Sequence, residues 1–135
     1  MAKAERELGI ESDVVVYQTH SFNYSNTLDL HLNDYPLPIK ILKILKFLNT
    51  SINKYDVLHF NFGRSILDYP YIFDYIDLPL IKKSRKKILI TFQGCDARTK
   101  DYCLNNFEIS ACMECDSKCI SENKKRRRFQ KAEKY

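Results

Sequence analysis

Two stretches of the chain share one design, an apolar, β-rich run that breaks abruptly into polar residues, a glycine and an arginine. Residues 55–65 read Tyr-Asp-Val-Leu-His-Phe-Asn-Phe-Gly-Arg-Ser, and residues 88–98 read Ile-Leu-Ile-Thr-Phe-Gln-Gly-Cys-Asp-Ala-Arg. In open α/β sheets, ligands bind outside the carboxyl ends of the strands. Packing of a core does not require the polar side chains at these two ends. We therefore expect them to form two walls of one cleft.

The order of the predicted elements along the chain indicates a parallel sheet. Apolar runs predict three strands, at residues 13–17, 55–62 and 87–92. Helical spacing predicts four helices, at about residues 2–8, 38–52, 72–83 and 121–135. The polar residues 18–36 are predicted to be a loop. Alternating helices and strands imply a Rossmann-like parallel sheet with right-handed crossovers, and strands that are apolar on both faces imply a sheet covered on both sides.

The composition excludes several classes of protein. The 135 residues suffice for one domain with a core and are too few for two. Hydrophobic residues make up 44% and aromatic residues 13%, which excludes wholesale disorder. No apolar run approaches the ~18 residues that span a bilayer, and the charged first residues lack the apolar segment of a signal peptide. We expect a cytoplasmic protein, at most peripheral at the inner face of the membrane.

The two ends of the chain lie inside predicted helices. The first helix would normally follow a strand, and the last reaches Tyr135 without a stop signal. An α/β domain does not usually begin and end in this way. We therefore expect residues 1–135 to be a single partial domain of a larger protein, truncated at both ends. A small complete domain with frayed ends is the alternative.

The end of the second predicted strand carries candidate catalytic and binding residues. His59 and Asn61 fall on the same face of that strand, because side chains alternate. A histidine can accept a proton from a hydroxyl near neutral pH, although a buried histidine bonded to backbone is the competing interpretation. Gly63, Arg64 and Ser65 follow directly. They fit either an anion site at a helix start or a tight turn with a surface arginine.

The end of the third predicted strand supplies the facing set of candidates. Gln93 precedes Gly94, and a glycine allows the backbone to approach a ligand closely. Asp96 and Arg98 are suited to binding sugar hydroxyls. The competing interpretation is an ion pair between these two side chains that fixes the loop.

The cysteines gather in a predicted loop at residues 95–119. Spacings of eight, two and three residues separate four of them, Cys103, Cys112, Cys115 and Cys119. Four thiolates suit a structural zinc ion, although the second close pair of a zinc ribbon is missing. Reduced thiols that pack within the loop are the alternative.

The positive charge is concentrated near the end of the chain. The net charge is +5, and five consecutive basic residues contribute to it, namely Lys124, Lys125, Arg126, Arg127 and Arg128. This run is either a solvated helix face or a contact for anionic lipid or nucleic acid. Nucleic acid is the less favoured partner, because the basic residues converge with aromatic ones in this helix alone. Phe129, Ala132 and Tyr135 recur every three residues and would dock the helix to the domain.

Several of these segments together resemble a known enzyme family. They are residues 5–10 with 12–14, residues 55–60, residues 63–65, Asp77-Leu78-Pro79-Leu80, and residues 90–98. The chain is similar over most of its length to the N-terminal half of group 1 (GT4-type) bacterial glycosyltransferases. The resemblance implies an incomplete N-terminal half of a GT-B fold, in which two Rossmann-like domains face a cleft.

The resemblance also implies an activity and roles for residues. It implies transfer of a sugar from a nucleotide-sugar donor to a glycan or lipid-linked acceptor, as in the synthesis of cell-envelope polysaccharides. His59 and Asp96 would be catalytic, and the family's common His-x-His arrangement here reads His59, Phe60, Asn61. Residues that would bind substrate are Asn61, Gly63, Arg64, Ser65, Gln93, Gly94 and Arg98.

Two further expectations concern cofactors and activity. GT-B enzymes usually need no metal for catalysis, so zinc on the cysteines would be structural. The donor-binding domain is missing from this sequence, so we expect the chain alone to transfer no sugar. The alternative function is a non-catalytic α/β binding module that uses its basic helix.

Overall fold

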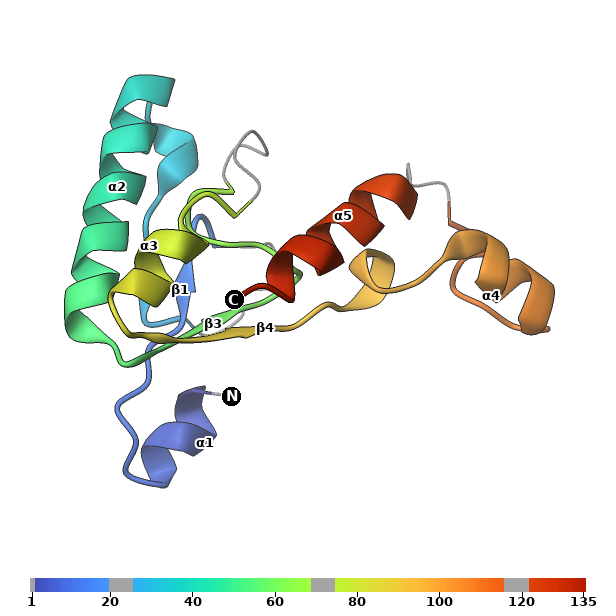
Figure 1. Ribbon diagram of the computed structural model, residues 1–135, viewed down its shortest axis with the longest axis horizontal. Coiled ribbons are helices and arrows are strands. Elements are labelled where there is room, and N and C mark those ends of the chain that lie inside the picture. The colour runs from blue at the N-terminus through green and yellow to red at the C-terminus, as the bar shows by residue number, and fades with distance from the viewer. Residues whose placement is uncertain (1, 20–25, 69–74, 116–121) are drawn as a thin grey trace. The chain divides into compact units, whose positions relative to one another are not determined.

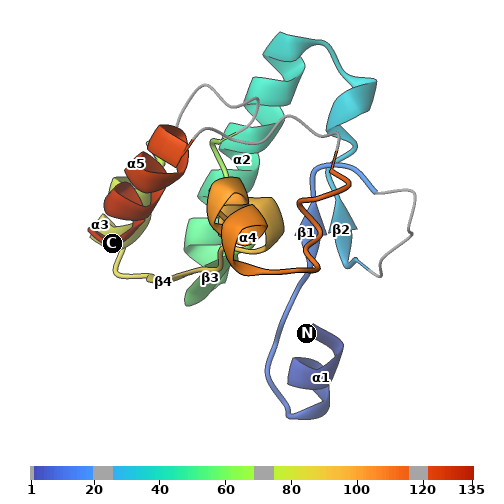
Figure 2. The same ribbon diagram turned by 90° about the vertical axis from the view of Figure 1, so that its right-hand side faces the viewer.

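The computed structural model describes residues 2–19, 26–68, 75–115 and 122–135 (Figures 1 and 2). The chain divides into two compact units, Met1–Phe47 and Leu48–Tyr135. In the described residues the fold is mixed α/β, with five α-helices and two parallel sheets of two strands each. The α/β class and the parallel pairing expected from the sequence are therefore confirmed.

The first unit contains the shorter of the two parallel ladders. Its elements are α1 (Ala2–Glu7), β1 (Val15–Val16), β2 (Leu28–Asp29), the 3-10 helix η1 (Leu32–Asp34) and the first part of α2 (Leu37–Lys54). In the ladder, Val15 stands opposite Leu28 and Val16 opposite Asp29. Gly9 has a φ of 80°, which fits its predicted place after the first helix.

Two predictions for this unit were wrong. Residues 18–36 are not all loop, because they contain β2 and η1. The first predicted strand pairs with β2, so the structure has two small sheets in place of one sheet of three strands. Only Leu28 and Leu30 are apolar in the short run that forms β2. The backbone of that run nevertheless bonds to the first strand, with Thr27 N–H donating to Val14 O at 2.8 Å and Leu30 N–H to Val16 O at 3.0 Å.

The second unit contains the longer ladder and most of the predicted site. After the end of α2, its elements are β3 (Val57–Phe60), α3 (Leu78–Lys83), β4 (Lys87–Ile90), the 3-10 helix η2 (Gly94–Asp96), α4 (Lys100–Asn106) and α5 (Glu122–Ala132). Strands β3 and β4 are parallel, and His59 stands opposite Leu89. Backbone pairing continues past the ladder, because Thr91 N–H donates to Phe60 O at 2.9 Å.

Two helices of this unit differ from the prediction. Helix α3 begins at Leu78, with Asp77 as its N-cap and Pro79 in its first turn. Pro79 fits there because the first turn of a helix has no use for its missing N–H. Residues 72–74 of the predicted helix lie outside the described residues. Helix α4 was not predicted and interrupts the expected cysteine-rich loop.

The two faces of the β3–β4 ladder have different surroundings. On one face Leu58 is buried, and Phe92 packs on Phe129 of α5 with ring centroids 4.0 Å apart. The docking of the last helix through its apolar residues therefore agrees with the sequence. On the other face Val57 is 53% exposed and Leu89 51%. The prediction that both faces of the sheet are covered was wrong for this face.

Candidate functional site

Four polar side chains meet where β3 and β4 end, and we call them the polar edge. They are His59, Asn61, Thr91 and Gln93. Thr91 Oγ1 donates to Asn61 Oδ1 at 2.8 Å, and His59 Nε2 lies 3.3 Å from Thr91 Oγ1. Gln93 Nε2 donates to Asn61 Oδ1 at 3.3 Å. All four share one ladder face, because neighbouring residues of parallel strands project to the same side.

The hydrogen bonds of Thr91 favour one tautomer of His59. A hydroxyl has one hydrogen, and that of Thr91 is directed to Asn61 Oδ1 or, at 3.4 Å, to the Phe60 carbonyl. With that hydrogen engaged, Thr91 Oγ1 can only accept at the His59 contact, which favours the tautomer with the hydrogen on Nε2. In the neutral ring Nδ1 is then the basic nitrogen. The polar edge thus pairs a proton acceptor with the exposed amide groups of Asn61 and Gln93.

A tight left-handed turn ends β3 directly after the polar edge. Phe62 has a φ of 58° and Gly63 a φ of 54°. A Cβ on Gly63 would lie 2.3 Å from the ring of Phe92, so only glycine fits there. Tyr75 donates from its hydroxyl to the Gly63 carbonyl. Strained backbone of this kind clusters at functional sites, where the surroundings hold it in place.

The other two residues predicted for the site after β3, Arg64 and Ser65, have different surroundings. Ser65 is 2% exposed and donates to Asp77 Oδ1 at 2.5 Å. The N–H of Leu67 donates to the other oxygen of that carboxylate at 3.1 Å. Ser65 therefore fixes the loop after β3, and Arg64 beside it is half-buried.

The residues predicted for the site after β4 are spread along the loop that follows this strand. Gly94 has a φ of 55° and begins η2, where a Cβ would make an ordinary contact of 3.6 Å with the Arg98 guanidinium. Arg98 is exposed. Asp96 is the last residue of η2, and its side chain lies outside what the structure describes. The structure thus brings His59, Asn61 and Gln93 together through Thr91.

A hollow of about 440 Å³ lies between the loop after β4 and α5. Its lining residues are Ala97, Thr99, Glu122, Lys125, Arg126, Phe129, Gln130 and Glu133. Lys125 is one of the lining residues, and its Nζ donates to the Arg98 carbonyl at 2.5 Å and to Glu122 Oε1 at 3.0 Å. We call this hollow the α5 groove.

A buried ion pair joins α5 to the loop after β3. Arg128 is 5% exposed and Asp68 2%, and the guanidinium donates to Asp68 Oδ2. The Arg128 guanidinium also lies 5.5 Å from the centre of the Tyr75 ring. Sequence reasoning missed this pair, because nothing in the basic run marks which of its members turns inward.

The cysteines do not form a recognisable metal site in the described part of the chain. Cys103 and Cys112 are buried, Cys115 is half-buried, and Cys119 lies outside the described residues. Among the described side chains, no three from histidine, cysteine, aspartate and glutamate are placed to hold one ion. Structural zinc on the four cysteines stays a prediction, since the fourth ligand is the one not described.

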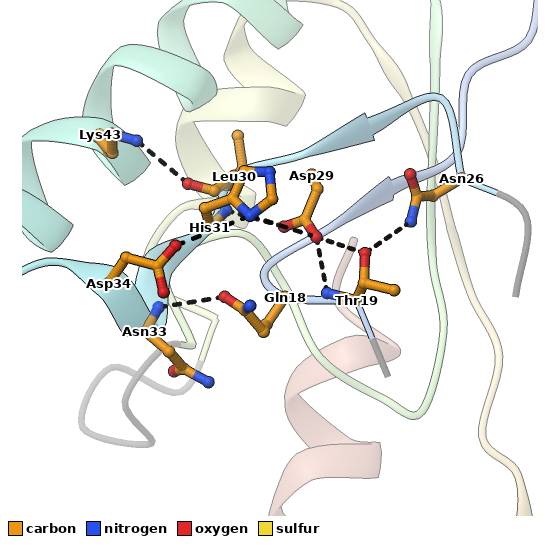
Figure 3. A network of polar contacts seen from close by, with 9 residues as sticks. All are labelled: Gln18, Thr19, Asn26, Asp29, Leu30, His31, Asn33, Asp34 and Lys43. Atoms are coloured by element: carbon orange, nitrogen blue, oxygen red, sulfur yellow. Dashed lines mark hydrogen bonds and ion pairs between the residues drawn. The ribbon is translucent and has the colours of Figure 1, made fainter. Parts of the chain in front are cut away.

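A second polar network, in the first unit, was not expected from the sequence (Figure 3). The Asp29 carboxylate accepts from the Thr19 hydroxyl, from Thr19 N–H at 2.7 Å and from His31 N–H at 2.8 Å. His31 Nδ1 lies 3.8 Å from both Asp29 and Asp34. The bond from the Thr19 hydroxyl lowers the pKa of Asp29 most, burial opposes this, and the backbone bonds and His31 lower the pKa further. The sequence predicts a loop here, so these carboxylates were not among the candidates.

Comparisons with known proteins do not assign the chain to a family. The chain matches no family model, no curated protein and no solved structure. In the described residues no helix has both the length and the apolar character needed to cross a bilayer. Function is therefore inferred from the chemistry of the residues themselves.

Proposed function

We propose that this chain is the acceptor-binding, Rossmann-like half of a GT-B glycosyltransferase of the group 1 type. One observation carries the proposal: the polar edge of His59, Asn61, Thr91 and Gln93 at the carboxyl ends of two adjacent parallel strands. Ligands of α/β sheets bind at this position. The segments that resemble the family include the same two strand ends.

The chemistry of the polar edge suits a sugar hydroxyl. The amide groups of Asn61 and Gln93 offer donors and acceptors at the exposed side of the edge. Nδ1 of His59 would accept the proton of the acceptor hydroxyl while its oxygen bonds to the anomeric carbon of the donor. The bond from that carbon to the diphosphate would break, and the nucleoside diphosphate would leave with the bonding electrons.

The alternative, a binding module that acts through its basic helix, has weaker support. Two of the five basic residues at positions 124–128, Lys125 and Arg128, are each 5% exposed and make bonds within the unit. These charges hold α5 in place and are not presented to a partner. The exposed remainder, Lys124, Arg126 and Arg127, is what an ordinary solvated helix face would show.

Binding of saccharides to the chain tests the proposal directly. Glucose, galactose, mannose and N-acetylglucosamine would be titrated while the amide signals of residues 57–63 and 87–94 are followed by NMR. Asn61→Ala with Gln93→Ala should weaken binding about tenfold, because each hydrogen bond contributes about 0.5–1.5 kcal/mol. Asn106→Ala on α4 removes an exposed amide elsewhere and should leave binding unchanged. Signals that shift only along the α5 groove would place the sugar elsewhere.

The proposal also predicts what the chain does alone. The donor's phosphates would find no partners in this half, and electrostatic stabilisation of the transition state usually contributes most to catalysis. No release of nucleoside diphosphate is expected from the chain with a panel of nucleotide sugars. Release is expected once a donor-binding domain is joined to it. Robust turnover by the isolated chain would contradict this division of labour.

A further inference from the structure

Helix α2 has one buried side. Ile44 and Leu48 are 2% and 4% exposed, and Ser51 is fully buried. These residues follow at intervals of four and three, so they form a single stripe along the helix. This stripe accounts for the packing of α2 within the protein.

A second apolar surface of α2 is open to solvent, and we call it the α2 ridge. It consists of Ile41, Leu42 and Leu45, which are 43%, 66% and 46% exposed. Leu45 is four residues from Ile41 and three from Leu42, so the three side chains are neighbours on the helix. Leu37 and Ile39 extend the exposed apolar surface toward the start of the helix, at 53% and 42%.

The charge of α2 has one sign. The helix contains four lysines and no aspartate or glutamate. Lys46 is exposed and lies one turn after Leu42, beside the ridge. Lys43 donates to the Leu30 carbonyl at 3.2 Å, so the helix also has a fixed cation on its far side. An occupant of the ridge must therefore be apolar where it meets Ile41, Leu42 and Leu45 and negatively charged beside Lys46.

We propose that the α2 ridge docks α2 in the interface of a membrane that contains anionic lipid. A helix lies in the plane of such an interface with its apolar residues among the acyl chains and the adjacent cation, here Lys46, at the headgroups. A second copy of the chain fits less well, because pairing of two ridges brings lysines against lysines. The inference is independent of the sugar-transfer proposal.

Helix α5 is a poor candidate for the same role. Its apolar residue Phe129 is stacked on Phe92, and Lys125 and Arg128 lie on the same inward side of the helix. What α5 exposes is charge without an apolar surface. We therefore propose α2 as the membrane-docking helix, and the membrane contact expected from the basic run of α5 stays a prediction.

A fluorescent reporter gives the sharpest test, because the chain contains no tryptophan. Leu42→Trp places one on the ridge, and Leu80→Trp places one on α3 at a position that is 50% exposed. Vesicles of phosphatidylcholine with one quarter phosphatidylglycerol would be added at low salt. A blue shift of the Leu42→Trp emission is expected, with none for Leu80→Trp. No shift of either, or a shift of both, overturns the proposal.

Sedimentation of the unaltered chain and of variants with the same vesicles gives the second test. Ile41→Ser with Leu45→Ser should reduce partitioning at least tenfold, because each half-exposed aliphatic side chain contributes roughly fivefold. Lys46→Gln should reduce it about fivefold, and Leu80→Ser should not reduce it. Circular dichroism checks that each variant keeps its helices.

Three outcomes of the sedimentation test would overturn the proposal. The first is failure of the unaltered chain to bind anionic vesicles. The second is loss of binding in Arg126→Gln with Arg127→Gln while the ridge variant binds normally. The third is a concentration-dependent dimer that the ridge variant abolishes while vesicles stay unbound, which would make a second copy the occupant.

Discussion

Helices α2 and α5 resemble each other in composition but differ in which of their side chains are buried. Both are basic, and both have apolar residues at helical spacing. Helix α5 turns Phe129 onto Phe92 and buries two of its cations with it. Helix α2 buries one stripe and leaves a second apolar surface exposed. The composition of a helix therefore does not predict which of its sides packs against the rest of the protein.

The difference lies in what each helix meets. The inward side of α5 finds the aromatic ring of Phe92, a carboxylate at Asp68 and a backbone carbonyl at Arg98. Each inward cation thus has an oxygen to bond, as buried charges require. The exposed leucines of α2 have apolar side chains only, and apolar atoms can remain at a surface without an unsatisfied bond. A buried charged residue therefore tells more about how a helix packs than an exposed apolar residue does.

The largest expected effect concerns the buried ion pair of α5. Asp68→Ala should lower the free energy of unfolding by about 3–5 kcal/mol, because Arg128 would stay buried without its partner. Lys46→Ala on α2 is the matched loss of an exposed charge and should change that free energy by less than about 0.5 kcal/mol. Urea unfolding measures both. Equal losses of unfolding free energy in the two variants would contradict the difference between the two helices.

The next effect concerns the apolar contacts. Phe129→Ala removes a half-buried ring stacked on Phe92 and should cost about 2 kcal/mol. Leu42→Ala removes a side chain that is 66% exposed and should cost less than about 0.5 kcal/mol. Thermal and urea unfolding of the two variants would be compared. A larger loss for Leu42→Ala would mean that the α2 ridge is covered within the protein.

The smallest effect concerns the polar network around Asp29 (Figure 3). The lowered pKa of Asp29 stabilises the folded state above the carboxyl's unfolded value of about 4. That contribution is lost as the pH falls through the lower folded value. Thr19→Ala removes the hydroxyl that lowers the pKa most, so the acid unfolding midpoint should move slightly upward. An unchanged midpoint would show that the network contributes no pH dependence.

Much of the second unit was predictable because its signals are local. The runs at β3 and β4 are apolar enough to predict strands, and their polar ends pointed to His59, Asn61 and Gln93. Thr91 was missed as a site residue because threonine is an ordinary strand residue. Its role depends on the ladder register, which places it beside Asn61.

The missed features depend on distant or weak signals. Asp68 and Arg128 are 60 residues apart, so no local pattern connects them. Strand β2 has two ladder residues and almost no apolar periodicity. Helix α4 was hidden because the cysteines suggested a loop, although Thr99 precedes it in the N-cap position. Periodic apolar patterns predicted the strands β3 and β4 and the helices α2 and α5, whereas the pairing of Asp68 with Arg128 left no local mark in the sequence.

The close fit of Gly63 against Phe92 has a consequence for motion. One edge of the Phe92 ring occupies the space that a Cβ on residue 63 would need, and the ring centre is 4.0 Å from that of Phe129. A ring held in this way cannot rotate by 180° about its axis unless its neighbours move apart. The flip rate of Phe92, read from the line shapes of its ring protons, therefore reports how often the contact between Phe92 and α5 opens.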